Sequence, residues 1–303
     1  MRRRPSGLVA TTTIAFVALL VASCSAPAAE SETPRVSTVA PLNNSVPLPE
    51  APPEQPTSAF DGLDARTRQA IGDAAEDGAD ISVVVLDRNT GQTVSGGDGS
   101  SFPIASVVKL FIADDLLLKV SKGETTLSPA DRKSLDSMLR SSDDGAAQNF
   151  WDRLGGSAVI ARVKARYGLG ATTAPWNGHW DVTTSTAADL VRYYDMLLNG
   201  SGGLPPEQAN LIMSDLAQST PTGIDGYPQR FGIPEGLYAE PVAVKQGWFC
   251  CWNGGNQLHV TTGVIGSERR YVLAMGSLDP TGAAAARDRM TQVVKTMFPG
   301  GKI

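Results

Sequence analysis

The chain has 303 residues, of which 42% are hydrophobic and 19% are charged, a composition typical of a globular protein with one large domain or two small ones. Its formal net charge is -5, and no run of Lys or Arg occurs beyond the N-terminus, which argues against nucleic acid as a partner. Removal of residues 1–23, which contain three arginines and no acid, leaves 23 basic and 31 acidic residues and a net charge of -8.

The N-terminus has the pattern of a bacterial export signal. A basic segment at residues 2–4 is followed by an apolar segment at residues 8–21, which is short for a membrane-spanning helix, although a single membrane anchor is the alternative. The apolar segment ends in the sequence VASC, which resembles the lipobox of bacterial lipoproteins. This resemblance implies a signal peptide at residues 1–23, lipidation of Cys24, and attachment through Cys24 to the extracytoplasmic face of the cell membrane.

Residues 24–58 are rich in Pro, Ser and Thr and contain no aromatic residue. Such a segment buries too little apolar surface to offset the entropy of ordering it, and its prolines favour an extended backbone. We therefore expect a tether at 24–58 and a folded domain at 59–303.

The domain begins with a predicted helix at 60–77, where apolar residues recur at helical spacing. A β-rich run at 81–86, a turn containing Asn and Gly, and a short strand at 93–95 predict a hairpin. An apolar run then predicts a helix at 106–119.

Residues 128–200 are expected to form helical segments that are interrupted by glycines, the last of them beginning after Ser185 as N-cap. Three β-rich runs at 241–246, 257–265 and 270–277 and a helix at 283–297 complete the chain. Strands from both ends can form one antiparallel sheet, with the first and last helices packed on it.

Ser106 and Lys109 stand three residues apart near the start of the predicted apolar helix. Residues at this spacing share a helix face, and a neighbouring lysine can accept the proton of a serine hydroxyl and make it a nucleophile. Alone, the pair is better read as a helix-terminal serine and a solvated lysine. Two segments that follow in order give it meaning, namely Ser142-Asp143-Asp144 and Lys245-Gln246-Gly247.

Together these segments resemble the S-x-x-K, S-D-N and K-T-G motifs of the penicillin-recognising serine hydrolases. The resemblance covers most of residues 60–300 and is greatest to class A β-lactamase-like sequences. It implies an α+β, three-layer fold of the β-lactamase/transpeptidase type, in which helices and a helical subdomain flank an antiparallel sheet. It implies no cofactor and no metal, and the two histidines show no metal-ligand spacing.

The resemblance also implies roles for individual residues. Ser106 would be the acylated nucleophile, Lys109 its general base, and Ser142 a proton relay. Lys245 would supply positive potential near a substrate carboxylate. The backbone N–H groups of Ser106 and Trp248 would form the oxyanion hole, and substrate would contact four residues: Asp144, Gln246, Gly247 and Trp248.

Asp144 stands where the family carries Asn. An ionised Asp cannot donate a hydrogen bond to a substrate carbonyl, and a carboxylate near Lys109 favours the ammonium form and raises the lysine pKa. We therefore expect slow acylation of Ser106, faster in Asp144→Asn.

Two further departures concern the third motif and a missing acid. Gln246 replaces a small hydroxyl residue, so we expect a longer side chain that fills more of the cleft. No Glu lies between Tyr167 and Asp181, where class A enzymes carry the Glu that activates the deacylating water. We expect no efficient β-lactam hydrolysis and a persistent acyl-enzyme, and we assign Asp181 no role in replacing that Glu.

Cys250 and Cys251 are adjacent, and lipidation of Cys24 would leave them as an even pair in an oxidising location. They form either a vicinal disulfide or two packed free thiols. A thiol-redox function is the least favoured because no C-x-x-C arrangement occurs.

The leading function is a membrane-anchored serine hydrolase that acts by acyl transfer, with a peptidoglycan peptide or a β-lactam as ligand. The alternative is a catalytically retired domain that binds a cell-wall ligand or a partner in the same cleft. Asp144, Gln246 and the missing Glu favour the alternative, whereas retention of the Ser and Lys residues of the motifs favours the enzyme.

Overall fold

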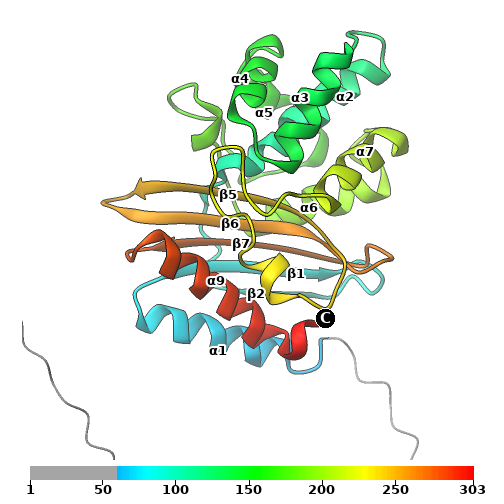
Figure 1. Ribbon diagram of the computed structural model, residues 1–303. Coiled ribbons are helices and arrows are strands. Elements are labelled where there is room, and N and C mark those ends of the chain that lie inside the picture. Colours follow the sequence, from blue (N-terminus) through cyan, green and yellow to red (C-terminus); the bar gives the residue numbers. More distant parts are fainter. Residues whose placement is uncertain (1–59) are drawn as a thin grey trace, which may run out of the picture. The chain divides into compact units, whose positions relative to one another are not determined.

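The computed structural model describes residues 60–303 (Figure 1). The predicted signal peptide, Cys24 and the tether at 24–58 lie outside the described residues. Within 60–303, no helix combines the length and apolar character needed to cross a membrane.

A five-stranded antiparallel sheet forms the centre of the domain, with the strand order β2-β1-β7-β6-β5. Its strands are β1 (Asp80–Asp87), β2 (Thr93–Gly96), β5 (Val242–Trp252), β6 (Asn256–Ile265) and β7 (Tyr271–Asp279). Pairing of β1 with β7 joins the two ends of the chain, from Asp80 opposite Leu278 to Asp87 opposite Tyr271. The predicted antiparallel sheet is thus confirmed, and β5 runs six residues further than the expected 241–246.

Helices cover both faces of this sheet, which gives three layers (Figure 1). One face carries α1 (Leu63–Glu76), α9 (Ala283–Met297) and the short α8 (Ile233–Gly236). The other face carries a helical subdomain made of α2 (Lys109–Ser121), α3 (Pro129–Arg140), α4 (Asp144–Arg153), α5 (Ala158–Tyr167), α6 (Ala187–Asn199) and α7 (Pro206–Ala217). A two-stranded ribbon pairs β3 (Phe102–Pro103) with β4 (Thr184–Ser185).

Helix α2 is the centre of the subdomain, because every residue from Lys109 to Leu118 is buried. A helix that is buried on all sides must pair any charge that it carries. Lys109 bonds Asp144, Asp114 bonds Arg166, and Asp115 bonds Arg162. These pairs tie α2 to α4 and α5.

Three details differ from the sequence expectation. Ser106 lies in a 3-10 turn at Ala105–Val108, and the α-helix begins only at Lys109. The N-cap of α6 is Thr186 and not Ser185, because Thr186 Oγ1 accepts the Asp189 N–H at 3.1 Å while Ser185 pairs within β4. Helices α7 and α8 were not expected from the sequence.

Candidate active site

Ser106 and Lys109 meet where the 3-10 turn joins α2. Lys109 Nζ lies 2.7 Å from Ser106 Oγ, and both side chains are buried. Ala105, directly before the serine, has a φ of 45°, a left-handed conformation that a residue with a Cβ adopts at a cost. This turn places the serine hydroxyl against the lysine amine.

Lys109 Nζ also contacts the loop before α4. It lies 2.8 Å from the Ser142 carbonyl oxygen, 3.1 Å from Ser142 Oγ and 2.5 Å from Asp144 Oδ1. Burial lowers the pKa of Lys109, while the Asp144 carboxylate acts in the opposite direction. The expected upward contribution of Asp144 is present, but the net shift is downward because desolvation of the ammonium outweighs it.

Ser142 lies between the two lysines of the motifs. Its Oγ is 3.1 Å from Lys109 Nζ and 3.0 Å from Lys245 Nζ, so one hydroxyl links both amines. Ser142 has a φ of 57°, and the next residue, Asp143, caps α4 by accepting the Ala146 N–H. Left-handed residues with a side chain are concentrated at functional sites in proteins.

Lys245 is only 1% exposed and does not line the cavity next to Ser106. Its Nζ is bound to Ser142 Oγ and, at 3.2 Å, to the Gln246 carbonyl oxygen. Burial, followed by the nearby Lys109, lowers its pKa well below the ordinary lysine value. The expected role of Lys245 as a positive group near a substrate carboxylate stays a prediction, and its amine reaches the site through Ser142.

Gln246 points to the other side of β5. Its Nε2 donates to the carbonyl oxygens of Gln229 at 3.0 Å and Phe231 at 2.7 Å, and the side chain is 1% exposed. Gln246 therefore does not line the cavity next to Ser106, and its expected contact with substrate stays a prediction.

Gly247 allows β5 to approach the serine turn closely. A Cβ at this position would lie 2.6 Å from the Ile104 carbonyl oxygen and 3.3 Å from Ser106 N. The absence of a side chain therefore lets β5 pass close to the turn that carries Ser106.

A small cavity of about 120 Å³ opens beside Ser106. Its walls are made of Ala105, Ser106, Asp144, Trp180, Asp181, Asp225, Trp248 and Phe249. Trp248 and Asp144 are thus placed with the serine, as the sequence analysis expected. Asp181, which was assigned no role, also lines this cavity.

The loop that contains Asp225 was not recognised from the sequence as part of the site. Its Ile224 N–H donates to the Ser141 carbonyl oxygen at 2.7 Å, and its Thr220 N–H donates to the Arg140 carbonyl oxygen at 3.0 Å. These bonds hold the loop against the junction of α3 and α4. The Pro, Gly and Asp residues at 221–226 signal a turn, but nothing local signals where that turn packs.

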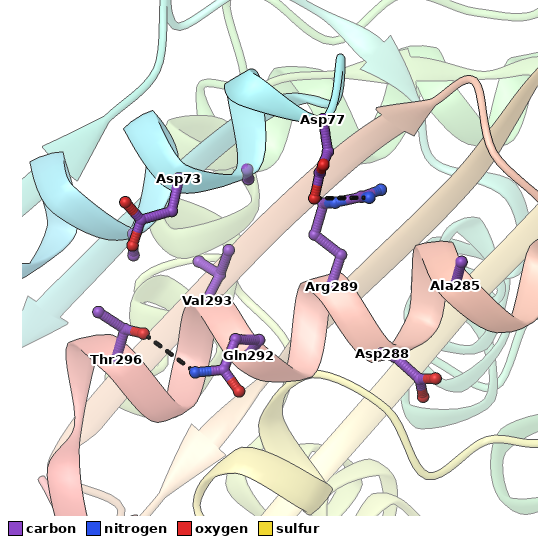
Figure 2. Close-up of a pocket in the computed structure, with 10 residues that line it drawn as sticks. Asp73, Asp77, Ala285, Asp288, Arg289, Gln292, Val293 and Thr296 are labelled. Carbon is purple, nitrogen blue, oxygen red and sulfur yellow. Dashed lines mark hydrogen bonds and ion pairs between the residues drawn. The ribbon is translucent and has the colours of Figure 1, made fainter.

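A larger cavity of about 460 Å³ lies between α1 and α9, in the layer of the domain that does not carry the serine (Figure 2). Figure 2 shows Arg289 paired with Asp77 at one end and Gln292 bonded to Thr296 at the other. No nucleophile paired with a base lines this cavity among the described residues. The larger of the two cavities is therefore not the one that contains the candidate catalytic residues.

Cys250 and Cys251 are joined in a disulfide near the end of β5, and both residues are exposed. The structure thus has the vicinal disulfide and not the two packed thiols. Nearby on β6, His259 Nε2 lies 2.7 Å from the Tyr227 hydroxyl oxygen.

Comparison with known proteins identifies the family of this chain. Residues 65–132 match the model of the Beta-lactamase enzyme family. The lipoprotein LppW of Mycobacterium tuberculosis strain H37Rv is 54% identical over 316 residues, with 100% of both chains covered. The chain belongs to the LppW family of β-lactamase-like lipoproteins. The LppW protein of Mycobacterium bovis shows the same identity and coverage.

Solved structures support the fold of this LppW-family chain. A β-lactamase from Chitinophaga pinensis matches with a TM-score of 0.61 and 16% identity, over 77% of this chain and 98% of that one. The structure named PBP-A matches with a TM-score of 0.64 and 18% identity, over 77% of this chain and 94% of that one. At this identity the likeness establishes the α+β, β-lactamase-type fold and nothing further.

In this LppW-family site, we expect Asp144→Asn to speed acylation of Ser106 at pH 7 roughly threefold to tenfold. The Asp144 carboxylate raises the Lys109 pKa, so its removal increases the neutral, proton-accepting fraction of the amine. Rates of adduct formation with an uncharged fluorophosphonate between pH 6 and pH 10 test this, with Asp152→Asn on the exposed side of α4 as control. An equal or lower rate in Asp144→Asn contradicts the prediction.

Two buried groups outside the serine site, His259 and Asp215, are expected to change the free energy of unfolding in opposite directions as the pH falls. Burial lowers the His259 pKa to about 4, so the folded state binds fewer protons than the unfolded state between pH 6.5 and 4. Burial and then Asp136 raise the Asp215 pKa to about 6, so the folded state binds more protons between pH 3.8 and 6. Acidification therefore lowers the free energy of unfolding through His259 and raises it through Asp215.

Urea denaturation from pH 4 to pH 7 should separate these contributions, each of which is roughly 3 kcal/mol. As the pH falls from 7 to 4, the free energy of unfolding of His259→Gln should rise relative to that of the wild type. The free energy of unfolding of Asp215→Asn should fall relative to that of the wild type. Only the pH dependence is compared, because the first variant also loses the bond to Tyr227. Parallel profiles for the two variants would exclude this explanation.

Proposed function

We propose that residues 59–303 are a serine hydrolase domain that transfers an acyl group to Ser106, and that lipidated Cys24 anchors it to the outer face of the cell membrane. One observation carries the catalytic part: Lys109 Nζ lies 2.7 Å from Ser106 Oγ in a buried setting that lowers the lysine pKa. A buried amine of lowered pKa is a base that can activate a serine.

The acyl transfer follows from the contacts around Ser106. Neutral Lys109 takes the Ser106 proton as Oγ attacks the carbonyl carbon of an ester or amide. The bond from that carbon to the leaving oxygen or nitrogen then breaks, and the proton passes to the leaving group through Ser142, which contacts Lys109. Backbone N–H groups of Ser106 and Trp248 stabilise the carbonyl oxygen, as the family motifs imply.

The family resemblance points to a cell-wall peptide as the natural substrate class and to a β-lactam as a ligand. No Glu lies between Tyr167 and Asp181, so we propose that hydrolysis of the acyl-enzyme is slow. Membrane attachment is supported by the lipobox-like VASC sequence and by the lipoprotein name of the 54% identical relatives.

The alternative is a domain that binds an envelope ligand in the same cleft without catalysis, and Asp144, Gln246 and the missing Glu favour it. The space of about 120 Å³ next to Ser106 is below the roughly 300–1,000 Å³ of most ligand pockets. A cavity this small accommodates only part of a substrate in the observed conformation.

Intact-mass spectrometry of the full-length chain, incubated with a penicillin and separately with an uncharged fluorophosphonate, tests the proposal. We expect a stable adduct that disappears in Ser106→Ala and persists in Ser214→Ala, which removes an exposed serine of α7. Absence of any adduct from a folded sample would favour the alternative.

A further inference from the structure

Trp248 stands at the edge of the sheet, in the wall of the cavity next to Ser106. Its strand, β5, is the last in the strand order, and within residues 60–303 its sheet partner is β6 alone. The strand passes close to the serine turn at Gly247, where an added Cβ would lie 3.3 Å from Ser106 N. A hydrogen-bond donor stabilises an oxyanion only when it is held about 2.7–3.1 Å from it. The backbone N–H of Trp248 therefore needs a fixed position on a strand that the sheet supports from one side.

The ring of Tyr227 stacks on the Trp248 indole. The two ring centroids lie 4.8 Å apart, with an interplanar angle of 9°. The same loop also packs on the indole at Gly223, where an added Cβ would lie 3.2 Å from Trp248 Cη2. The Gly223 N–H donates to the Tyr227 carbonyl oxygen at 2.8 Å, so the ring and the glycine belong to one turn. The loop before α8 therefore packs on Trp248 through two of its residues.

The hydroxyl of Tyr227 is bonded to two other elements of the fold. Arg287 Nη1 on α9 donates to it at 2.7 Å, and His259 Nε2 on β6 lies 2.7 Å from it. Because Arg287 donates, the hydroxyl retains its own proton for His259 Nε2. His259 is buried and stands directly opposite Trp248 in the pairing of β5 with β6. The tyrosine is thus held at its hydroxyl as well as at the face of its ring.

Tyr227 also fixes a second wall of the cavity without lining the cavity itself. Its backbone N–H donates to Asp225 Oδ1 at 2.9 Å, and Asp225 lies next to the serine. In the same loop, the Ile224 N–H donates to the Ser141 carbonyl oxygen at 2.7 Å, which ties the loop to the helical subdomain. Any effect of Tyr227 on chemistry at the serine must therefore pass through the residues that it holds.

We propose that Tyr227 is a positioning residue for acylation of Ser106, which holds the backbone N–H of Trp248 in place through its stack on the indole. Arg287 and His259 support this role by fixing the tyrosine hydroxyl. The inference rests on the proposed acyl transfer and adds a residue that lies outside the three motifs. An oxyanion donor binds more strongly in the transition state than in the ground state, so its displacement lowers the maximal rate more than the affinity.

An uncharged fluorophosphonate and its P=S analogue test this proposal with the full-length chain. With each reagent, Ser106 Oγ bonds to phosphorus, the P–F bond breaks, fluoride leaves, and Lys109 takes the serine proton. Sulfur accepts hydrogen bonds more weakly than oxygen, so the P=O reagent gains more from the Trp248 N–H. In Tyr227→Leu we expect the maximal labelling rate with the P=O reagent to fall about 10- to 100-fold, with affinity changed less than about threefold. The ratio of P=O to P=S rates should fall several-fold.

Two further variants assign this effect to the stack and its anchor. Tyr227→Phe keeps the ring and removes the hydroxyl, so its rate should fall only about two- to fivefold. Tyr238→Leu is the matched control, because Tyr238 lies just after α8 and is 67% exposed, and it should match the wild type in rate and ratio. A folded Tyr227→Leu with the wild-type rate, or with a lower rate and an unchanged ratio, would overturn the inference. If Tyr227→Leu does not fold, an unchanged ratio in Tyr227→Phe would overturn it.

The indole N–H proton of Trp248 gives a readout that needs no labelling. Its NMR signal, assigned from the spectrum of Trp248→Phe, should shift in Tyr227→Leu because the stacked ring is lost, and should stay in place in Tyr238→Leu. If the wild type forms no adduct, the proposed acyl transfer has failed, and a shifted signal supports positioning of Trp248 in a site without catalysis. An unshifted signal would show that Tyr227 does not hold Trp248, whatever the outcome for Ser106.

Discussion

Replacement of Lys109 by Met should reduce the rate of Ser106 labelling by an uncharged fluorophosphonate by about 10²- to 10⁴-fold, the usual contribution of a general base. Lys109 Nζ lies 2.7 Å from Ser106 Oγ, and Met has no group that accepts the hydroxyl proton. In the wild type the rate should rise with pH and level off below the ordinary lysine pKa of 10.5, because burial lowers the Lys109 pKa.

Lys119→Met is the matched control, since Lys119 lies on the same helix and pairs with Glu124 at 3.0 Å. It should leave the labelling rate and its pH profile unchanged. Circular dichroism of Lys109→Met should show the wild-type fold, so that loss of labelling reports on the base. Labelling at the wild-type rate in a folded Lys109→Met protein would assign the activation of Ser106 to another group.

Replacement of Arg166 by Met should lower the free energy of unfolding at pH 7 by roughly 3–5 kcal/mol, because it leaves a buried carboxylate without its cation. Asp114 is 0% exposed and bonds both Arg166 and the Tyr167 hydroxyl. Arg166 also donates to the Gly202 carbonyl oxygen at 2.7 Å, so the pair ties α2, α5 and the loop after α6 together.

The loss should be smaller at pH 5. Burial already raises the Asp114 pKa, and removal of the guanidinium raises it further, so the folded variant takes up a proton as the pH falls. Arg68→Met, which breaks the exposed pair with Asp64 on α1, should change stability by less than about 0.5 kcal/mol. Urea denaturation at both pH values measures this, and an effect of Arg166→Met no larger than that of Arg68→Met would refute the argument.

Most of the fold was accessible from local patterns. Alternating and continuous apolar runs marked β1, β6 and β7, and helical periodicity marked α1 and α9, because these elements bury regular faces against one another. Helix α7 was not predicted, since no element was assigned to the segment between residue 200 and the strand expected at 241. The N-cap of α6 was misplaced by one residue because adjacent Ser and Thr have the same capping chemistry.

The sequence by itself determined the candidate nucleophile and base, Ser106 and Lys109, through the order of the three motifs, and their spacing of three residues lets them meet within one turn. It also identified Ser142 and Asp144 through the order of the motifs. Tertiary structure alone decided that Lys245 is buried behind Ser142 and that Gln246 faces away from the cleft. It alone brought Asp181, from the 3-10 turn at Trp180–Val182, and Asp225, from the loop before α8, to the serine. Burial and long-range packing set the charge of this site, and neither is encoded in a short stretch of residues.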